Sequence, residues 1–201
     1  MTNIGIVCAM REEVEKITTA FNLTQIDSYL DYPIYQNTHI TLIESSIGKV
    51  ASTLATTTLI DQFNVGKIIN IGLAGAIKPI PAGSAYFVQS VTQHDAFIPF
   101  DNYQQDMYQS IDCYVPEQSD ETLVLTTGDQ FITDNSQIKN GADIVDMEGF
   151  GVAYVANRHH IPVTLIKGAS DDANNSSEAE LFKNLNNAME QTIVLLKIAL
   201  N

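Results

Sequence analysis

The chain has 201 residues, of which 45% are hydrophobic and 17% are charged, and it carries a net charge of −14 at neutral pH. This length and composition exclude an intrinsically disordered protein, and we expect a single compact domain over residues 1–201. The strong negative charge argues against nucleic acid as a partner, because proteins that bind nucleic acids need a basic surface.

The two cysteines, Cys8 and Cys113, have neither the spacing of a metal site nor that of a disulfide framework. We therefore expect a reducing, cytoplasmic setting. No apolar run reaches the roughly 18 residues of a membrane span. The first residues also lack the basic-then-apolar order of a signal peptide, so we expect no membrane association.

The first predicted elements are a buried strand over residues 4–9 and a helix that follows at once and ends near Phe21. Two adjacent acids, Glu12 and Glu13, lie at the turn between them. Neighbouring residues of a helix point about 100° apart, so at most one of these acids can face a cleft. Acids at the start of a helix are also common on solvated surfaces, and this stretch alone leaves both interpretations open.

Two short strands are predicted over residues 34–36 and 39–45, followed by a helix that ends near Phe63. Ser46 and Gly48 lie in the turn before this helix. They could offer a hydroxyl and backbone N–H groups to a ligand, or form an ordinary helix cap with a glycine turn. The stretch does not separate these two interpretations.

The next predicted strands cover residues 67–71 and 85–91. The small residues Gly72 and Gly75 follow the first of them and allow a ligand to approach the backbone closely. Their spacing is a weak phosphate motif, because it matches neither the dinucleotide-binding fingerprint nor a P-loop. Residues 93–116 are predicted to be irregular, and their aromatic side chains indicate an interface or an apolar substrate pocket.

A strand over residues 122–127 precedes the most informative stretch, residues 144–155, which begins as an apolar strand and turns helical. Asp146 and Glu148 lie at the join, at the carboxyl edge of the predicted sheet, where open α/β folds bind ligands. A carboxylate there can accept hydrogen bonds from both vicinal hydroxyls of a ribose. It can equally favour the first turn of the helix through the macrodipole, so the stretch alone leaves both roles open.

The last strand is predicted over residues 161–168, and Ser177 to Glu180 form a capping box for a final amphipathic helix. The adjacent histidines His159 and His160 cannot share one helix face, so they do not predict a metal site. Strands alternate with helices along the whole chain. This order predicts a three-layer α/β/α sandwich around a mostly parallel or mixed central sheet.

Several stretches that span most of the chain occur together in the order found in one known family. They are Ile4-Gly5-Ile6 with Ala9-Met10-Arg11-Glu12-Glu13-Val14, Ser46-Ile47-Gly48-Lys49-Val50, Ile69-Asn70-Ile71-Gly72-Leu73-Ala74-Gly75, His94-Asp95-Ala96, Gly128-Asp129-Gln130-Phe131-Ile132, Val145-Asp146-Met147-Glu148 and Ala169-Ser170-Asp171. Together they resemble the nucleoside phosphorylase/nucleosidase superfamily, and most of all its 5′-methylthioadenosine/S-adenosylhomocysteine nucleosidase branch. The resemblance implies a nucleoside phosphorylase-like fold.

The resemblance also implies hydrolysis of an N-glycosidic bond through an oxocarbenium-like transition state. Asp171, held near Ser170, would deliver a proton to N7 of the purine so that the base can leave. Glu13 would activate or orient the attacking water. A purine leaves poorly as an anion, so a general acid worth about 10²–10⁴ in rate is needed.

For the substrate, the resemblance implies that Glu148 holds the ribose hydroxyls, with Met147 packed on the sugar. Phe131 would stack on adenine, and Ile132 would hold the base through its backbone. Aromatic residues near Phe97 would help form the pocket for the 5′-substituent at a homodimer interface. Further substrate-binding positions would be Ala9, Met10, Ser46, Ile47, Leu73, Ala74, Gly75, Asp146, Lys167 and Ser170. The partner would be a small purine nucleoside, and neither a metal nor an organic cofactor is implied.

The sequence departs from the family pattern at Leu73, where the branch usually has serine, and at Lys167, where it usually has arginine. Only two arginines occur, Arg11 and Arg158, which is too few for the arginine-built phosphate site of a phosphorylase. We therefore expect a hydrolase. Two alternatives remain open: a futalosine-type or other purine nucleoside hydrolase, and a degenerate protein that binds a nucleoside without turning it over.

Overall fold

The computed structural model describes residues 3–97, 99–100, 109–119, 121–172 and 178–200, without the side chains of residues 27, 171–172 and 178–183. Within these residues the helices are α1 (Arg11–Phe21), α2 (Lys49–Phe63), α4 (Gly149–Arg158) and α5 (Glu178–Ala199), with a 3₁₀ turn η2 (Asn135–Gln137). The strands are β1 (Ile4–Cys8), β2 (Thr24–Tyr29), β3 (Tyr32–Gln36), β4 (Ile40–Glu44), β5 (Lys67–Ala76), β6 (Ala85–Gln93), β7 (Ile111–Asp112), β8 (Thr122–Thr127), β9 (Ile144–Asp146) and β10 (Val163–Asp172).

The strands form one mixed sheet in the order β10-β6-β8-β9-β5-β1-β4-β3-β2, with β7 paired to β6. β1 pairs in parallel with β4 and β5, while β6 and β9 run antiparallel to β10 and β5 respectively. β10 also pairs with β5, so that β5, β10, β6, β8 and β9 close into a ring. The predicted mixed sheet is confirmed, and its partial closure is a feature that the linear pattern of elements did not predict.

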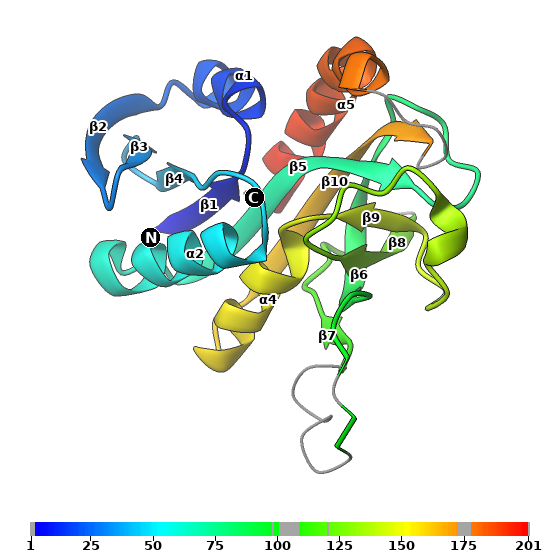
Figure 1. Ribbon diagram of the computed structural model, residues 1–201. Coiled ribbons are helices and arrows are strands. Elements are labelled where there is room, and N and C mark those ends of the chain that lie inside the picture. The colour runs from blue at the N-terminus through cyan, green and yellow to red at the C-terminus, as the bar shows by residue number, and fades with distance from the viewer. Residues whose placement is uncertain (1–2, 98, 101–108, 120, 173–177, 201) are drawn as a thin grey trace.

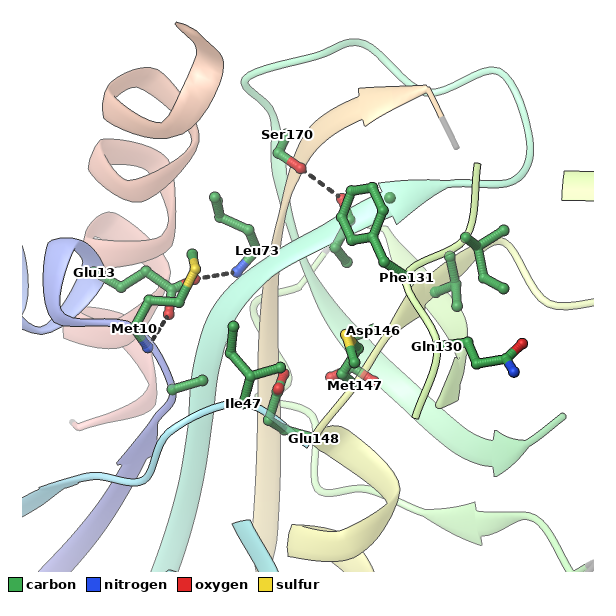
Figure 2. Close-up of a pocket in the computed structure, with 15 residues that line it drawn as sticks. Met10, Glu13, Ile47, Leu73, Gln130, Phe131, Asp146, Met147, Glu148 and Ser170 are labelled. Carbon is green, nitrogen blue, oxygen red and sulfur yellow. Dashed lines mark hydrogen bonds between the residues drawn. The ribbon is translucent and has the colours of Figure 1, made fainter. Parts of the chain in front are cut away.

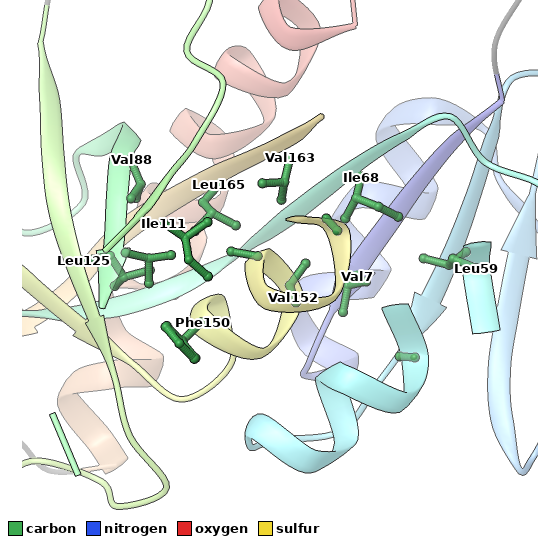
Figure 3. Packing of buried hydrophobic residues seen from close by; sticks show 14 of the residues in the cluster. Val7, Leu59, Ile68, Val88, Ile111, Leu125, Phe150, Val152, Val163 and Leu165 are labelled. Carbon is green, nitrogen blue, oxygen red and sulfur yellow. The ribbon is translucent and has the colours of Figure 1, made fainter. Parts of the chain in front are cut away.

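Helices cover the sheet on both faces, as the predicted three-layer arrangement requires (Figure 1). On one face Val14 of α1 and Leu185 of α5 join a buried cluster with Ile6 of β1. On the other face Leu59 of α2 and Val152 of α4 belong to a second cluster (Figure 3). Val7 of β1 points into this second cluster while its neighbours Ile6 and Cys8 point into the first, as the period-2 geometry of a strand dictates.

Several elements differ from the sequence-based expectation, among them the short strand β7, which lies within the stretch 93–116 that was predicted to be irregular. β2 was not predicted, because its residues Thr24–Tyr29 are largely polar and show no apolar alternation. β5 and β10 extend beyond their predicted ends at residues 71 and 168, since their small residues continue to pair as far as Ala76 and Asp172. The predicted capping box begins at Ser177, which lies outside the described residues. Among the residues that the structure describes, no helix is long and apolar enough to cross a membrane.

The crossing of α2 and α4 depends on Gly151. A Cβ atom at this position would lie 2.8 Å from the carbonyl oxygen of Lys49 and 2.8 Å from the hydroxyl of Ser52. The backbone of Lys49 cannot yield as a flexible side chain could. The helices therefore approach this closely only because residue 151 has no side chain.

We expect Gly151→Ala to lower the free energy of unfolding by about 1–3 kcal/mol, because it overpacks the crossing. Alanine normally stabilises a helix relative to glycine, so a decrease in stability of this variant can be attributed to the steric clash. Urea unfolding measures it, with Val194→Ala on the exposed face of α5 as a control that should change stability by less than about 0.5 kcal/mol. A Gly151→Ala variant as stable as the wild type would contradict this account.

Candidate active site

One cavity gathers residues from six separate segments at the carboxyl ends of β1, β4, β5, β9 and β10 and in the loop after β8. In Figure 2, Glu13 and Met10 lie on one side, Phe131 on the other, and Glu148 below. The carboxyl edge of a sheet is where α/β folds place ligands. The lining residues are Ala9, Met10, Glu13, Ile47, Leu73, Ala74, Gly75, Gln130, Phe131, Ile132, Val145, Asp146, Met147, Glu148 and Ser170.

Glu13 is the acid of the first turn that enters the cavity. It is 2% exposed, whereas its neighbour Glu12 is exposed, as the helical geometry required. Its carboxylate accepts hydrogen bonds from the N–H groups of Leu73 at 2.8 Å and Met10 at 3.1 Å, and from the Cys8 thiol at 3.4 Å. Burial raises the pKa of Glu13, and these hydrogen bonds only partly oppose the rise. Glu13 is therefore a fixed carboxylate with an enhanced tendency to take up a proton.

The approach of Glu13 to β5 requires Gly72. A Cβ atom at residue 72 would lie 3.0 Å from Oε1 of Glu13. This is tighter than normal packing, so a larger residue would displace the carboxylate from the Leu73 N–H. The absence of a side chain at Gly72 thus allows the Glu13 carboxylate to lie directly against β5.

Glu148 faces the same cavity from the turn before α4. Its carboxylate accepts a hydrogen bond from the N–H of Gly48 at 3.0 Å, which ties it to the turn before α2. Burial raises the pKa of Glu148 to about 7, and the Asp146 carboxylate adds to the effect while Lys167 opposes it. The carboxyl group is therefore partly protonated near neutral pH.

Asp146 and Lys167 form a buried ion pair beneath the cavity. Their Oδ2 and Nζ atoms are 2.7 Å apart, and each side chain is 1% exposed. Asp146 also accepts hydrogen bonds from the Thr127 hydroxyl at 2.6 Å and the Gly149 N–H at 2.8 Å. Burial alone would lower the pKa of Lys167, but the carboxylates of Asp146 and Glu148 raise it above its ordinary value. Lys167 is therefore a cation.

In the described part of the chain, the buried acids Glu13, Asp146 and Glu148 lie near one buried cation, Lys167, and the remaining walls are mostly apolar. Met10, Ile47 and Leu73 line the cavity near Glu13, while Phe131 lines it across from them (Figure 2). Ile132 also belongs to the lining. Phe131 is 52% exposed, so its ring lies at the mouth. The arrangement can accept a ligand with a flat apolar part and a polar part that carries hydroxyl groups or positive charge.

Most of the predicted site residues meet in this cavity, whereas Ser46 and Lys167 do not line it. Ser46 is exposed, with its neighbour Ile47 lining the cavity instead, and Lys167 lies beneath through its pairing with Asp146. Asp171 is the next-to-last residue of β10, where its backbone pairs with Gly75, and its side chain lies outside the described residues. The serine before it, Ser170, lines the cavity and donates to the carbonyl of Ala74 at 3.4 Å.

Two lining residues, Gln130 and Val145, were missing from the predicted set. Both lie inside stretches that carried the resemblance, so the predicted site residues next to them could have indicated that they also line the cavity. Among the residues that the structure describes, no group of three or more His, Cys, Asp or Glu side chains could hold a metal ion.

Comparisons with known proteins agree with the fold. Residues 3–201 match the family model described as "Phosphorylase superfamily". The 5′-methylthioadenosine/S-adenosylhomocysteine nucleosidase of Pseudoalteromonas translucida is 30% identical, with 87% of this chain and 86% of that protein covered. The aminodeoxyfutalosine nucleosidase of Helicobacter pylori is 28% identical, with 96% of each chain covered.

Solved structures give the same fold. The 5′-methylthioadenosine/S-adenosylhomocysteine nucleosidase from S. pneumoniae superposes with a TM-score of 0.87 at 24% identity, over 98% of this chain and 97% of that one. A futalosine hydrolase mutant of Helicobacter pylori gives 0.85 at 24% identity, over 98% of each chain. The molecule is thus an α/β protein of the nucleoside phosphorylase-like fold. The chain belongs to the phosphorylase superfamily.

The raised pKa of Glu148 predicts a pH dependence of stability. Its pKa rises from 4.5 to about 7 in the folded protein, so its contribution to stability is complete below about pH 4.5 and is lost as the pH rises through 7. Between pH 5 and 8 the wild type should lose up to about 3 kcal/mol through this group. Glu148→Gln should remove that part of the slope.

Urea unfolding at pH 5, 6, 7 and 8 measures this slope. Glu12→Gln is the matched control, because Glu12 is an exposed acid on α1 and should leave the wild-type slope unchanged. A Glu148→Gln variant that keeps the full wild-type slope would show that Glu148 is ionised without penalty in the folded protein.

Proposed function

We propose that this protein hydrolyses the N-glycosidic bond of a purine nucleoside and releases adenine from 5′-methylthioadenosine or S-adenosylhomocysteine. The observation that carries the proposal is the cavity in which the buried acids Glu13 and Glu148 converge between apolar walls. The names of the relatives, which are nucleosidases covering most of the chain, support it.

Glu148 would hold the ribose. One carboxylate can accept hydrogen bonds from two vicinal hydroxyls, and the Gly48 N–H at 3.0 Å fixes its orientation. Met147, the preceding residue, lines the same cavity and would pack on the sugar. Because hydroxyl donors favour the ionised carboxylate, nucleoside binding would release the proton that Glu148 carries in part near neutral pH.

Glu13 would orient the attacking water and accept its proton. Its carboxylate is held by two backbone N–H groups and its pKa is raised by burial, so it is both positioned and basic enough for this role. The nearby charges favour the same reaction. With Glu13, Asp146 and Glu148 against a single buried cation, Lys167, the site is complementary to the positive charge that develops on the sugar.

Asp171 would protonate the leaving base at N7. Its place at the end of β10, next to the cavity-lining Ser170 and beside Gly75, supports this role. The base itself would lie against Phe131 and Ile132, with Gln130 at its edge. The bond between C1′ and the base nitrogen breaks as water adds to C1′. One proton passes to Glu13 and one passes from Asp171 to the base.

Water rather than phosphate is the proposed nucleophile. No arginine lies among the described residues that line the cavity. Arg11 is exposed and pairs with Glu15 at 3.2 Å, while Arg158 ends α4. The nearest buried cation, Lys167, is already paired with Asp146. A phosphate dianion would therefore meet the acidic side chains of Glu13, Asp146 and Glu148, with no free cation among the described lining residues to bind it.

Aminodeoxyfutalosine is the second candidate substrate. The aminodeoxyfutalosine nucleosidase of Helicobacter pylori matches 96% of this chain, which favours a substrate with a different 5′-substituent. Met10, Ile47 and Leu73 form an apolar wall near Glu13 that would contact such a group. Relative rates with the three nucleosides as substrates discriminate between the candidates.

We further infer a homodimer in a reducing, cytoplasmic setting. The free thiols Cys8 and Cys113 support the setting. Exposed apolar side chains support the dimer: Val50 and Leu54, one turn apart on α2, are 81% and 43% exposed, and Phe97 is 83% exposed. Side chains of this kind in one region indicate a protein interface.

The dimer is tested by sedimentation of Val50→Asp. We expect the wild type to sediment as a dimer and Val50→Asp to shift it toward monomer, because a carboxylate would be buried without a partner. Val194→Asp, which changes an exposed valine of α5, should remain dimeric. A monomeric wild type, or equal effects of the two substitutions, would exclude α2 as the interface.

The proposed reaction is tested by adenine release from 5′-methylthioadenosine without phosphate. We expect turnover by the wild type and by Glu12→Gln, and a loss of about 10²–10⁴-fold in Asp171→Asn and in Glu13→Gln. Added phosphate should not change the rate. The sugar product should be free 5-methylthioribose and not its 1-phosphate. Tight nucleoside binding without turnover by the wild type would instead indicate a nucleoside-binding protein.

A further inference from the structure

Two segments that line the cavity, the turn before α2 and the loop after β8, are far apart in the sequence. They are joined by contacts between residues that do not themselves line the cavity. The turn before α2 supplies Ile47 to the cavity and the Gly48 N–H to Glu148. The loop after β8 supplies Phe131 and Ile132. The residues that join these two segments do not line the cavity, and the proposed reaction assigns them no role.

Lys49, the first residue of α2, makes most of these connections. Its backbone N–H donates to Oδ1 of Asp129 at 2.9 Å. Its ammonium donates to Oδ1 of Asp95 at 2.5 Å and to Oε1 of Gln93 at 3.1 Å, and lies 3.7 Å from Oδ2 of Asp129. The lysine side chain is 18% exposed, so this cation is largely withdrawn from solvent.

Asp95 completes the connection. Its second oxygen, Oδ2, accepts a hydrogen bond from the N–H of Asp129 at 2.8 Å, so one carboxylate holds both Lys49 and the loop after β8. Burial raises the pKa of Asp95, but the Lys49 ammonium and the Asp129 N–H outweigh burial and keep that pKa below its ordinary value. Asp95 is therefore ionised, and both of its contacts are charge-assisted hydrogen bonds, which are the stronger kind.

The connection lies close to the cavity along the chain on both sides, because Lys49 is two residues after the lining residue Ile47 and Asp129 is one residue before the lining residue Gln130. Gly48, which precedes Lys49, donates to Glu148, and Asp129 is followed directly by Gln130, Phe131 and Ile132. Gly48 has a φ of +107°, and a Cβ atom there would lie 3.3 Å from Oδ1 of Asp129. The turn before α2 and the loop after β8 are therefore held together by close packing at Gly48 as well as by the ion pair.

We propose that Lys49 and Asp95 are positioning residues that fix the base-binding loop relative to the ribose-binding Glu148, which deepens the function proposed above and rests on it. The pair touches neither base nor sugar. It holds Phe131 and Glu148 at the separation that a purine nucleoside requires, and so limits the conformations that the empty site must lose on binding.

A purely structural ion pair predicts a different result. Loss of such a pair would change the stability of the fold but would leave the affinity for substrate unchanged. Measurements of substrate affinity, and not of stability, therefore distinguish the two interpretations.

The test compares Lys49→Met with Lys78→Met. Lys78 is a suitable control because it also pairs with an aspartate across a long stretch of sequence, Asp143, 65 residues away, and neither residue lines the cavity. We expect Lys49→Met to raise KM for 5′-methylthioadenosine about tenfold and to weaken adenine binding by a similar factor, with kcat changed less. Amide hydrogen exchange at residues 128–132 should accelerate. Lys78→Met should show none of these changes.

Asp95→Asn provides the second arm. If the two side chains act as one unit, the double variant Lys49→Met/Asp95→Asn should be no worse than the poorer single variant. KM and adenine affinity within twofold of the wild type in Lys49→Met, with exchange at residues 128–132 unchanged, would overturn the proposal. Adenine affinity and hydrogen exchange need no turnover, so they test the positioning role even if the wild type fails to hydrolyse nucleosides.

Discussion

The buried Asp146–Lys167 ion pair is the interaction on which the rest of the site depends. Asp146 contacts the Thr127 hydroxyl at the end of β8, the Gly149 N–H at the start of α4 and the Lys167 ammonium on β10. Removing two charges from water is costly, and only close pairing and further hydrogen bonds offset that cost. Because these contacts lie on three different elements, the same interaction that stabilises the charges also fixes the floor of the cavity.

The ion pair leaves the cavity with excess negative charge. Glu13 and Glu148 are buried near a cation that is already paired, so their ionised forms are penalised and their pKa values rise. A ligand that brings hydroxyl donors or positive charge relieves this penalty. In the proposed function, this relief would favour binding of the ribose and stabilise a cationic transition state.

Small residues at the carboxyl end of the sheet make this concentration of acids possible. Gly72 admits the Glu13 carboxylate against β5, and Gly151 admits α4 against α2. The pairing of Gly75 and Ala76 with both β9 and β10 brings three strand ends to one edge. The closed part of the sheet thus brings Val145, Ser170 and Gly75 from distant parts of the chain to one cavity.

The sequence by itself determined the local features whose causes lie within a few residues. It gave the strand over residues 122–127, the alternation of strands and helices, and the conclusion that only one of Glu12 and Glu13 can face a cleft. The ordered stretches also identified most of the residues that line the cavity. Hydrophobic period and helical geometry are local properties, so a linear reading captures them.

Only the tertiary structure decided the contacts between distant segments. Nothing in the sequence showed that Lys167 lies beneath the cavity paired with Asp146, that Ser46 stays outside it, or that Lys49 joins Asp95 and Asp129. The polar strand β2 is likewise recognisable only through its pairing with β3. The physical reason is that burial, and with it the charge state of Glu148 and Lys167, depends on neighbours from many strands that meet only when the sheet closes.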